Sequence, residues 1–216
     1  MMDQPFGARF MTIGLLAFLT FAGSAQSQNF NFYVLSLSWS PTYCAMRTDA
    51  PRSRQCESKA NFGFIVHGLW PQYERGYPEF CSTREPRRVP AALGEEMFDI
   101  MPSMGLIGHQ WRKHGSCTGL SQRDYLATTR RAFDRIRIPE RVSDGKARMS
   151  LSVDEIEQMF VSANPGMTKQ GIAAKCEDRQ LEEVRICLTT DLRFRDCEEV
   201  DRGGCRRDRI ELPPIN

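Results

Sequence analysis

The sequence predicts an α+β fold: a single domain in which a central, mainly antiparallel sheet is flanked by helices and stapled by disulfide bonds. Two observations predict it. Segments with a two-residue period lie toward both ends of the chain, whereas segments with helical periodicity lie between them. The chain also has eight cysteines, all beyond residue 43. An even number of cysteines downstream of an export signal is typical of a disulfide framework.

Residues 1–25 have the composition of an export signal peptide. Arg9 supplies a positive charge, an apolar run of 13 residues follows, and the small residues AGSA predict cleavage near Ala25. The run is shorter than the roughly 18 to 20 residues of a transmembrane helix, and no later stretch comes closer. We therefore expect a periplasmic or extracellular protein without a membrane anchor, whose residues 26–216 form one domain.

Two strands are predicted near the start of this domain. In residues 30–41 large and small residues alternate, which predicts a half-buried strand ended by Pro41. The larger side chains of this strand share one face: Tyr33, Leu35, Leu37 and Trp39. Residues 61–71 are a denser apolar run, which predicts a central strand that breaks at Gly68 and Pro71.

Helical patterns follow in the middle of the chain. Residues 72–89 have no period and predict a loop. Residues 89–101 predict a helix with Pro90 in its first turn. A break at residues 101–103 precedes a second helix, which we expect to run through residues 109–117.

Two capped helices and two strands complete the predicted fold. Ser121 and Ser152 are each followed three residues later by an acidic residue, Asp124 and Glu155, which is the pattern of a helix N-terminus. Both helices are expected to cover the sheet. The remaining predicted strands span residues 171–178 and 180–191, and the segment from there to Asn216 is predicted to be irregular.

The formal net charge of +2 is small for a protein of 216 residues. Proteins that bind nucleic acid tightly and with strong salt dependence usually carry a clear excess of basic residues. The composition therefore argues against a large nucleic-acid footprint. A nucleic acid, if bound at all, would be held briefly as a substrate.

The stretch HQWRKHGSC, residues 109–117, concentrates titratable groups on one side of a predicted helix. At about 100° per residue, four polar side chains share one arc: His109, Gln110, Lys113 and His114. Trp111 points away from this arc and is free to be buried, as we also expect for Trp39. Gly115 follows directly and is a usual helix stop.

The spacing of the two histidines favours an anion over a metal ion. The zinc pattern H-x-x-x-H places two imidazoles four residues apart, whereas His109 and His114 are five apart with the cation Lys113 between them. A secreted zinc hydrolase is therefore a disfavoured alternative, and a phosphate-handling site is the better interpretation. His67, at the exit of the second predicted strand, is the third histidine of the chain. Two histidines can serve as acid and base near neutral pH.

These residues resemble the motifs of the ribonuclease T2 family. FIVHGLWP at residues 64–71 is similar to the first motif of that family, and HQWRKHGSC is similar to the second. SWSPTYC at 38–44 and MPS at 101–103 are similar too. The resemblance implies cleavage of single-stranded RNA without metal or other cofactor, by attack of the ribose 2′-oxygen on phosphorus through a 2′,3′-cyclic phosphate.

The resemblance also implies roles for individual residues. His114 would be the base for the 2′-hydroxyl and His67 the acid for the leaving 5′-oxygen, although their order stays open at this stage. Lys113 would stabilise charge on the phosphoryl oxygens and His109 would hold the phosphate. Four residues beyond or within the first motif would contact the substrate base: Trp70, Gln72, Tyr73 and Tyr77.

Gln110 departs from the family pattern, because family members usually carry glutamate there. An amide donates hydrogen bonds but does not titrate, so phosphate binding survives while an acid–base role does not. The alternative function is therefore a catalytically weak or inactive secreted module that binds RNA or protein on the same scaffold. In either case we expect a monomer.

The resemblance further implies a pairing of the eight cysteines, which spacing alone leaves open. Three pairs follow the family: Cys81 with Cys117, Cys187 with Cys197 and Cys176 with Cys205. Cys44 and Cys56 remain as the fourth pair.

Overall fold

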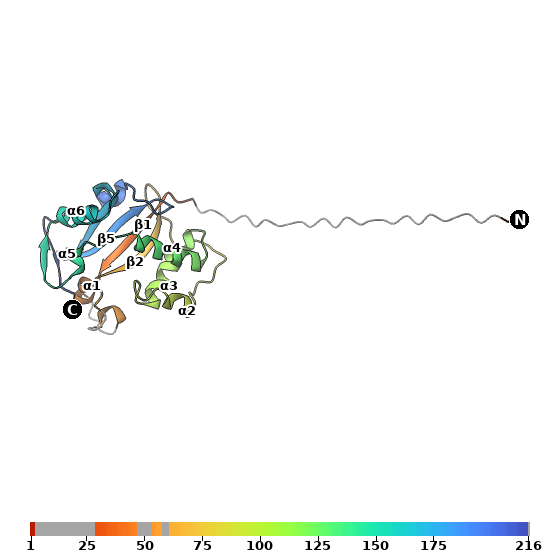
Figure 1. The fold of residues 1–216 in the computed structure, drawn as a ribbon, viewed down its shortest axis with the longest axis horizontal. Coiled ribbons are helices and arrows are strands. Elements are labelled where there is room, and N and C mark those ends of the chain that lie inside the picture. The colour runs from red at the N-terminus through yellow and green to blue at the C-terminus, as the bar shows by residue number, and fades with distance from the viewer. Residues whose placement is uncertain (3–28, 47–52, 58–60, 216) are drawn as a thin grey trace.

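A six-stranded sheet forms the centre of the structure, with helices packed around it (Figure 1). The computed structural model describes residues 1–2, 29–46, 53–57 and 61–215. Apart from its first two residues, the predicted signal peptide of residues 1–25 lies outside the described residues, as does the predicted start of the mature domain at residue 26.

The strands run in the order β2-β1-β5-β6-β3, and β4 pairs with β5. Their bounds are β1 Phe32–Trp39, β2 Phe64–Gln72, β3 Met149–Leu151, β4 Ile172–Glu177, β5 Gln180–Leu188 and β6 Ile210–Leu212. All described pairs are antiparallel except β5 with β6. The predicted α+β class with a mainly antiparallel sheet is therefore confirmed.

The α-helices surround this sheet. Their bounds are α1 Ser40–Met46, α2 Ala91–Glu95, α3 Met104–Lys113, α4 Gln122–Asp134, α5 Glu140–Ser143, α6 Val153–Ala163 and α7 Glu198–Arg202. Short 3-10 turns are η2 Arg54–Cys56, η3 Gly115–Cys117 and η4 Lys169–Gly171. None of these helices is both long and apolar enough to cross a membrane.

The first strand is more buried than its alternating pattern predicted. Every residue of β1 is buried except Ser38, so the prediction of a half-buried strand is wrong. The reason is its place between β2 and β5, where both faces are covered. The expected stop at Pro41 is also wrong in part. The strand ends at Trp39, and Pro41 lies in the first turn of α1, which begins at Ser40. Proline is tolerated in a first helical turn.

The second strand is an edge strand, not the central strand that its apolar run predicted. Among the described strands β2 pairs only with β1. It also continues through Gly68 and Pro71 to Gln72 instead of breaking there. An edge position explains the proline, because proline cannot donate a hydrogen bond to a second neighbouring strand.

The helices differ from the predicted spans mainly at their ends. The helix expected over residues 89–101 is limited to α2, and α3 ends at Lys113 because the chain tightens into a 3-10 turn at Gly115. The caps are as predicted: Ser121 Oγ accepts from Asp124 N at 3.1 Å, and Ser152 forms a capping box with Glu155. The C-terminal segment predicted to be irregular contains α7 and β6.

The hydrophobic core lies between one face of the sheet and helices α3, α4 and α6. The predicted core positions Trp39 and Trp111 are each 1% exposed. Their indole N–H groups donate to the carbonyls of Pro213 and Pro86 at 3.1 and 2.9 Å, which satisfies the polar atom of each buried ring. The opposite face, called the polar face below because it carries His67 and Arg185, also holds a smaller apolar cluster of Phe32, Val34, Cys187 and Cys197.

Four disulfide bonds hold the periphery to this sheet, and they are the pairs that the resemblance implied. They join Cys44 to Cys56, Cys81 to Cys117, Cys176 to Cys205 and Cys187 to Cys197. The last two attach both ends of the α7 segment to β4 and β5. The short helix α7 is therefore kept against the polar face of the sheet.

Removing the bond between Cys81 and Cys117 with the double substitution C81A/C117A is expected to lower the free energy of unfolding by about 4 kcal/mol, because it closes a sequence separation of 36 residues. The matched control is C44A/C56A, which opens a separation of 12 residues and should cost about 3 kcal/mol. Denaturant titration followed by circular dichroism measures both. A larger loss in the control would contradict this ranking.

Candidate active site

A β-bulge at His67 determines which side chains of β2 face the same way. In the pairing of β2 with β1, Leu37 lies opposite Val66 and Ser36 lies opposite Gly68, so His67 is an extra residue in β2. An extra residue reverses the alternation of side chains along a strand. Val66 and Leu69 can therefore both enter the core, while His67 and Trp70 both face the opposite side of the sheet and line one cavity.

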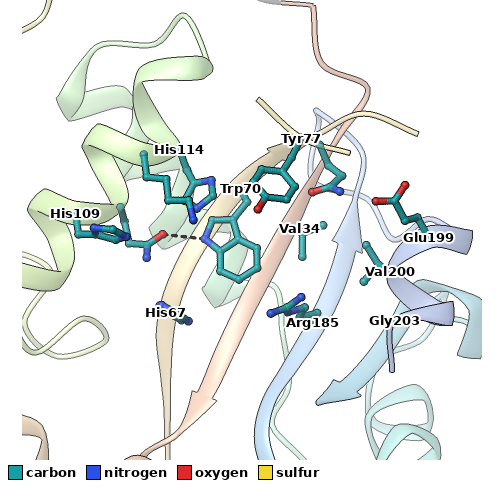
Figure 2. Close-up of a pocket in the computed structure, with 13 residues that line it drawn as sticks. Val34, His67, Trp70, Tyr77, His109, His114, Arg185, Glu199, Val200 and Gly203 are labelled. Atoms are coloured by element: carbon teal, nitrogen blue, oxygen red, sulfur yellow. Dashed lines mark hydrogen bonds between the residues drawn. The ribbon is translucent and has the colours of Figure 1, made fainter. Parts of the chain in front are cut away.

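Helix α3 brings the second motif to the same cavity. Ser103 caps the helix, its Oγ accepting from Leu106 N at 3.4 Å. Trp111 anchors the helix in the core. The four polar residues of the predicted arc all line the cavity on the other side of the helix (Figure 2): His109, Gln110, Lys113 and His114. The geometric prediction from helical spacing thus agrees with the structure.

The cavity has a volume of about 370 Å³ and lies over the polar face of the sheet. Beyond the two motifs it is lined by residues from three other parts of the chain, namely Val34 of β1, Arg185 of β5 and the α7 segment with Glu199, Val200 and Gly203 (Figure 2). No sequence pattern pointed to these residues. All are distant in sequence from the motifs, and the strand order of the sheet alone brings them there.

Trp70 connects the two motifs. Its indole Nε1 donates to Gln110 Oε1 at 2.8 Å, and its ring stacks on His114 with centroids 5.2 Å apart and an interplanar angle of 27°. The ring also meets His67 edge-on at 5.5 Å. Because an indole N–H only donates, the amide oxygen of Gln110 must face it, which directs the amide nitrogen elsewhere.

Gly68 is required by this close approach. A Cβ at position 68 would stand 2.2 Å from Gln110 Oε1 and 2.4 Å from Trp70 Nε1, far inside van der Waals contact. The glycine of the first motif therefore leaves room for the amide of the second. Gln110 itself is 2% exposed, so its orientation is set by packing as well as by the hydrogen bond.

The predicted base-contacting residues divide into two groups. Trp70, Gln72 and Tyr77 line the cavity, with the Tyr77 ring 6.1 Å from the His114 ring and 5.9 Å from Lys113 Nζ. Tyr73 does not line it and is 37% exposed at the surface. Trp70 also contacts His114 and Gln110 directly, so it organises the site in addition to any contact with a base.

His67 has a buried partner that sequence analysis missed. Its Nδ1 hydrogen-bonds Glu183 Oε1, and Glu183 is further paired with Arg185. Glu183 and Arg185 are polar residues at alternate positions of the strand predicted over residues 180–191. That alternation placed them on one face of a strand, but the sequence carried no signal that the strand lies two places from β2 in the sheet.

The environments of the other two histidines oppose protonation. Burial, with a smaller contribution from the positive charge of Lys113, lowers the pKa of His114 from 6.5 to about 3. Burial and the nearby cations Lys113 and Arg112 also lower the pKa of His109. His114 is 4% exposed, and its Nδ1 has no hydrogen-bond partner within the described part of the chain. The neutral imidazole is therefore the resting form of His114.

Among the described residues, two cations line the cavity: Arg185, which is paired with Glu183, and Lys113. Its ammonium lies 3.6 Å from Glu79 Oε2, and 28% of its side chain is exposed. In the described ranges no group of three or more His, Cys, Asp or Glu side chains is placed to hold a metal ion. The arrangement offers a lysine, a donor amide and imidazoles, which is a set of groups that suits a phosphate.

Comparison with known proteins gives consistent matches. Residues 30–197 match the sequence model of the Ribonuclease T2 family. A ribonuclease of Aeromonas hydrophila is 36% identical over 190 residues, covering 83% of this chain and 83% of its own. A probable ribonuclease of Haemophilus influenzae is 29% identical over 78% of this chain and 61% of its own.

Solved structures share the fold. The RNase-related protein from Calystegia sepium superimposes with a TM-score of 0.71 at 23% sequence identity, covering 87% of this chain and 99% of that one. At this identity the likeness concerns the fold. The family match spans most of the described chain, and the Aeromonas relative is similar over most of both lengths. The chain therefore belongs to the Ribonuclease T2 family.

Proposed function

We propose that this protein is an exported, metal-independent endoribonuclease that cleaves single-stranded RNA by transphosphorylation through a 2′,3′-cyclic phosphate. Membership of the Ribonuclease T2 family and the similarity to a ribonuclease support RNA cleavage in general. The single observation that carries the finer proposal is that His67 and His114 line one cavity together with Lys113.

The two histidines differ in a way that supports separate roles. His114 is buried and its pKa is lowered to about 3, so it is neutral near pH 5 to 7 and able to accept the 2′-hydroxyl proton. His67 hydrogen-bonds the buried carboxylate of Glu183 through Nδ1, which leaves Nε2 as the nitrogen that can donate to the leaving oxygen. Two histidines with such different surroundings suit the separate roles of base and acid.

The reaction that these roles describe is balanced within the site. His114 removes the proton of the 2′-hydroxyl, and the 2′-oxygen forms a bond to phosphorus. The bond from phosphorus to the 5′-oxygen breaks, its electron pair goes to that oxygen, and His67 supplies the proton. Lys113 stabilises the charge that develops on the non-bridging oxygens, and His109 helps to hold the phosphate.

As a glutamine, residue 110 can donate hydrogen bonds to the substrate but cannot act as an acid or base. Its Oε1 accepts from Trp70, so its Nε2 is left as the donor that can reach a phosphoryl oxygen. It cannot exchange a proton. We infer that the residue places the phosphate and that this enzyme turns over without an acid or base at position 110, at a lower rate than a carboxyl there would allow.

The remaining parts of the proposal concern location and substrate contact. Residues 1–25 and the four disulfide bonds support export to a periplasmic or extracellular space, where disulfides persist. Trp70, Gln72 and Tyr77 support contact with a base at the cavity. We propose that the protein acts as a monomer.

Purified mature protein is expected to cleave single-stranded RNA in excess EDTA and to leave 2′,3′-cyclic phosphate ends, because the proposed groups are all side chains. Mass spectrometry of the products detects these ends. Activity that appears only when a divalent metal is added would contradict the mechanism. RNA binding without any cleavage would favour the alternative of a non-catalytic binding module.

His67→Ala and His114→Ala are each expected to lower kcat by roughly 10² to 10⁴, the usual contribution of a positioned acid or base. Steady-state kinetics on a short single-stranded RNA measures this. Arg123→Ala is the control, since it removes an exposed cation of the neighbouring helix α4 that does not line the cavity, and kcat should change less than about twofold. Near-normal activity of the double variant His67→Ala/His114→Ala would contradict the assignment of these two residues as acid and base.

Gln110→Glu is expected to raise kcat by roughly tenfold near pH 5, because a carboxyl there can titrate. The new carboxylate would also stabilise protonated His114 and raise its pKa from about 3. Since His114 must be neutral, the acidic limb of kcat/KM should move to higher pH. Full pH–rate profiles measure both effects, with Gln158→Glu on the surface of α6 as control. If kcat and the pH–rate profile of Gln110→Glu are both unchanged, residue 110 only positions the phosphate.

A further inference from the structure

Glu183 is a buried carboxylate that reaches across a strand to His67. It lies on β5, whereas His67 lies on β2, and β1 runs between these strands. Strands two places apart are separated by about 9 to 10 Å. The residues of β1 opposite Glu183 and Arg185 are the small serines Ser38 and Ser36. Their short side chains leave the space through which a glutamate and a histidine meet.

The two carboxylate oxygens of Glu183 have separate partners. Oε1 binds His67 Nδ1, while Oε2 accepts from Arg185 Nε at 3.0 Å and from Nη2 at 2.9 Å. The guanidinium also lies 5.0 Å from the centre of the Trp70 ring, so Arg185 is itself held in place. With both oxygens engaged and 3% of the side chain exposed, the carboxylate has a single orientation.

The carboxylate is ionised despite its burial. Desolvation would raise its pKa, but the hydrogen bonds and charges of His67 and Arg185 together lower the pKa of Glu183 to about 2. The other titratable groups whose electrostatic effects couple to this network are Lys175 of the neighbouring strand β4, Glu182 of β5, His109 of α3 and His114 at the end of α3. None of these is in hydrogen-bond contact with His67 in the described structure.

We propose that Glu183 is a positioning residue for His67 and that Arg185 keeps its carboxylate in place. Glu183 holds the Nδ1 proton of His67, so Nε2 is the nitrogen that exchanges a proton with the substrate. This inference rests on the proposed function, in which His67 donates a proton to the leaving 5′-oxygen.

The proton count follows from this arrangement. Protonated His67 carries hydrogens on both ring nitrogens. When the bond from phosphorus to the 5′-oxygen breaks, the Nε2 proton passes to that oxygen, and the neutral ring keeps its Nδ1 hydrogen on Glu183. The carboxylate therefore stays ionised throughout and only orients and stabilises the ring.

The test is Glu183→Gln, which keeps the shape and an oxygen acceptor but removes the charge. We expect kcat to fall roughly 10- to 100-fold with KM changed less than about threefold. The alkaline limb of the pH–rate profile should move to lower pH, because the variant removes the negative charge that contacts His67. Loss of activity should therefore be smallest at acidic pH.

The matched control is Glu182→Gln, the adjacent carboxylate of the same strand. It is partly buried and couples to His67 only at longer range. It should leave kcat within about twofold and move the alkaline limb less than Glu183→Gln does. Arg185→Gln should fall between the two, since Glu183 keeps its charge but loses its support. If the pH–rate profile of Glu183→Gln overlays that of the wild type, the inference is overturned, even if that variant is less stable.

A measurement on the unaltered protein covers the case in which Glu183→Gln does not fold. Histidine side-chain ¹⁵N NMR should find the proton of neutral His67 on Nδ1, with Nε2 unprotonated. The opposite tautomer would contradict the role of Glu183. His67→Ala separates this inference from the proposed function: if it retains activity, the acid assignment fails, whereas an inactive His67→Ala beside a normal Glu183→Gln refutes only the inference.

Discussion

The β-bulge at His67 is the feature on which the rest of the site depends. Without the extra residue, the two-residue period of β2 would send His67 and Trp70 to opposite faces of the sheet, and one of them would enter the core. With it, Val66 and Leu69 fill the core from positions three residues apart. The polar face then receives a histidine and an indole side by side, which is what the second motif on α3 packs against.

The contact between the two motifs requires particular chemical groups at Trp70, Gln110 and Gly68. The indole N–H of Trp70 requires an acceptor, and Gln110 provides it at 2.8 Å. Gly68 provides the space, since any side chain there would overlap the amide. This explains how the position at which the family usually carries glutamate tolerates glutamine: the hydrogen bond to Trp70 needs only an oxygen. What the amide does not supply is a proton that can be exchanged.

The two proposed catalytic histidines sit in opposite electrostatic surroundings within one cavity. His114 is desolvated beside the cation Lys113, and both effects favour the neutral ring. His67 faces an ionised glutamate that is paired with an arginine. The proposed base is therefore held as the neutral ring, while the proposed acid has a fixed carboxylate partner on one of its two ring nitrogens.

Local sequence determined much of this protein. Helical spacing alone placed four polar groups of α3 on one arc and Trp111 in the core, and serine caps marked the starts of α4 and α6. These features depend on residues within one or two turns. Tertiary structure decided the burial of β1, the edge position of β2, the bulge at His67 and the partnership of His67 with Glu183. Each depends on the order in which strands pair, and pairing brings together residues as far apart as 67 and 183, whose contact no local pattern records.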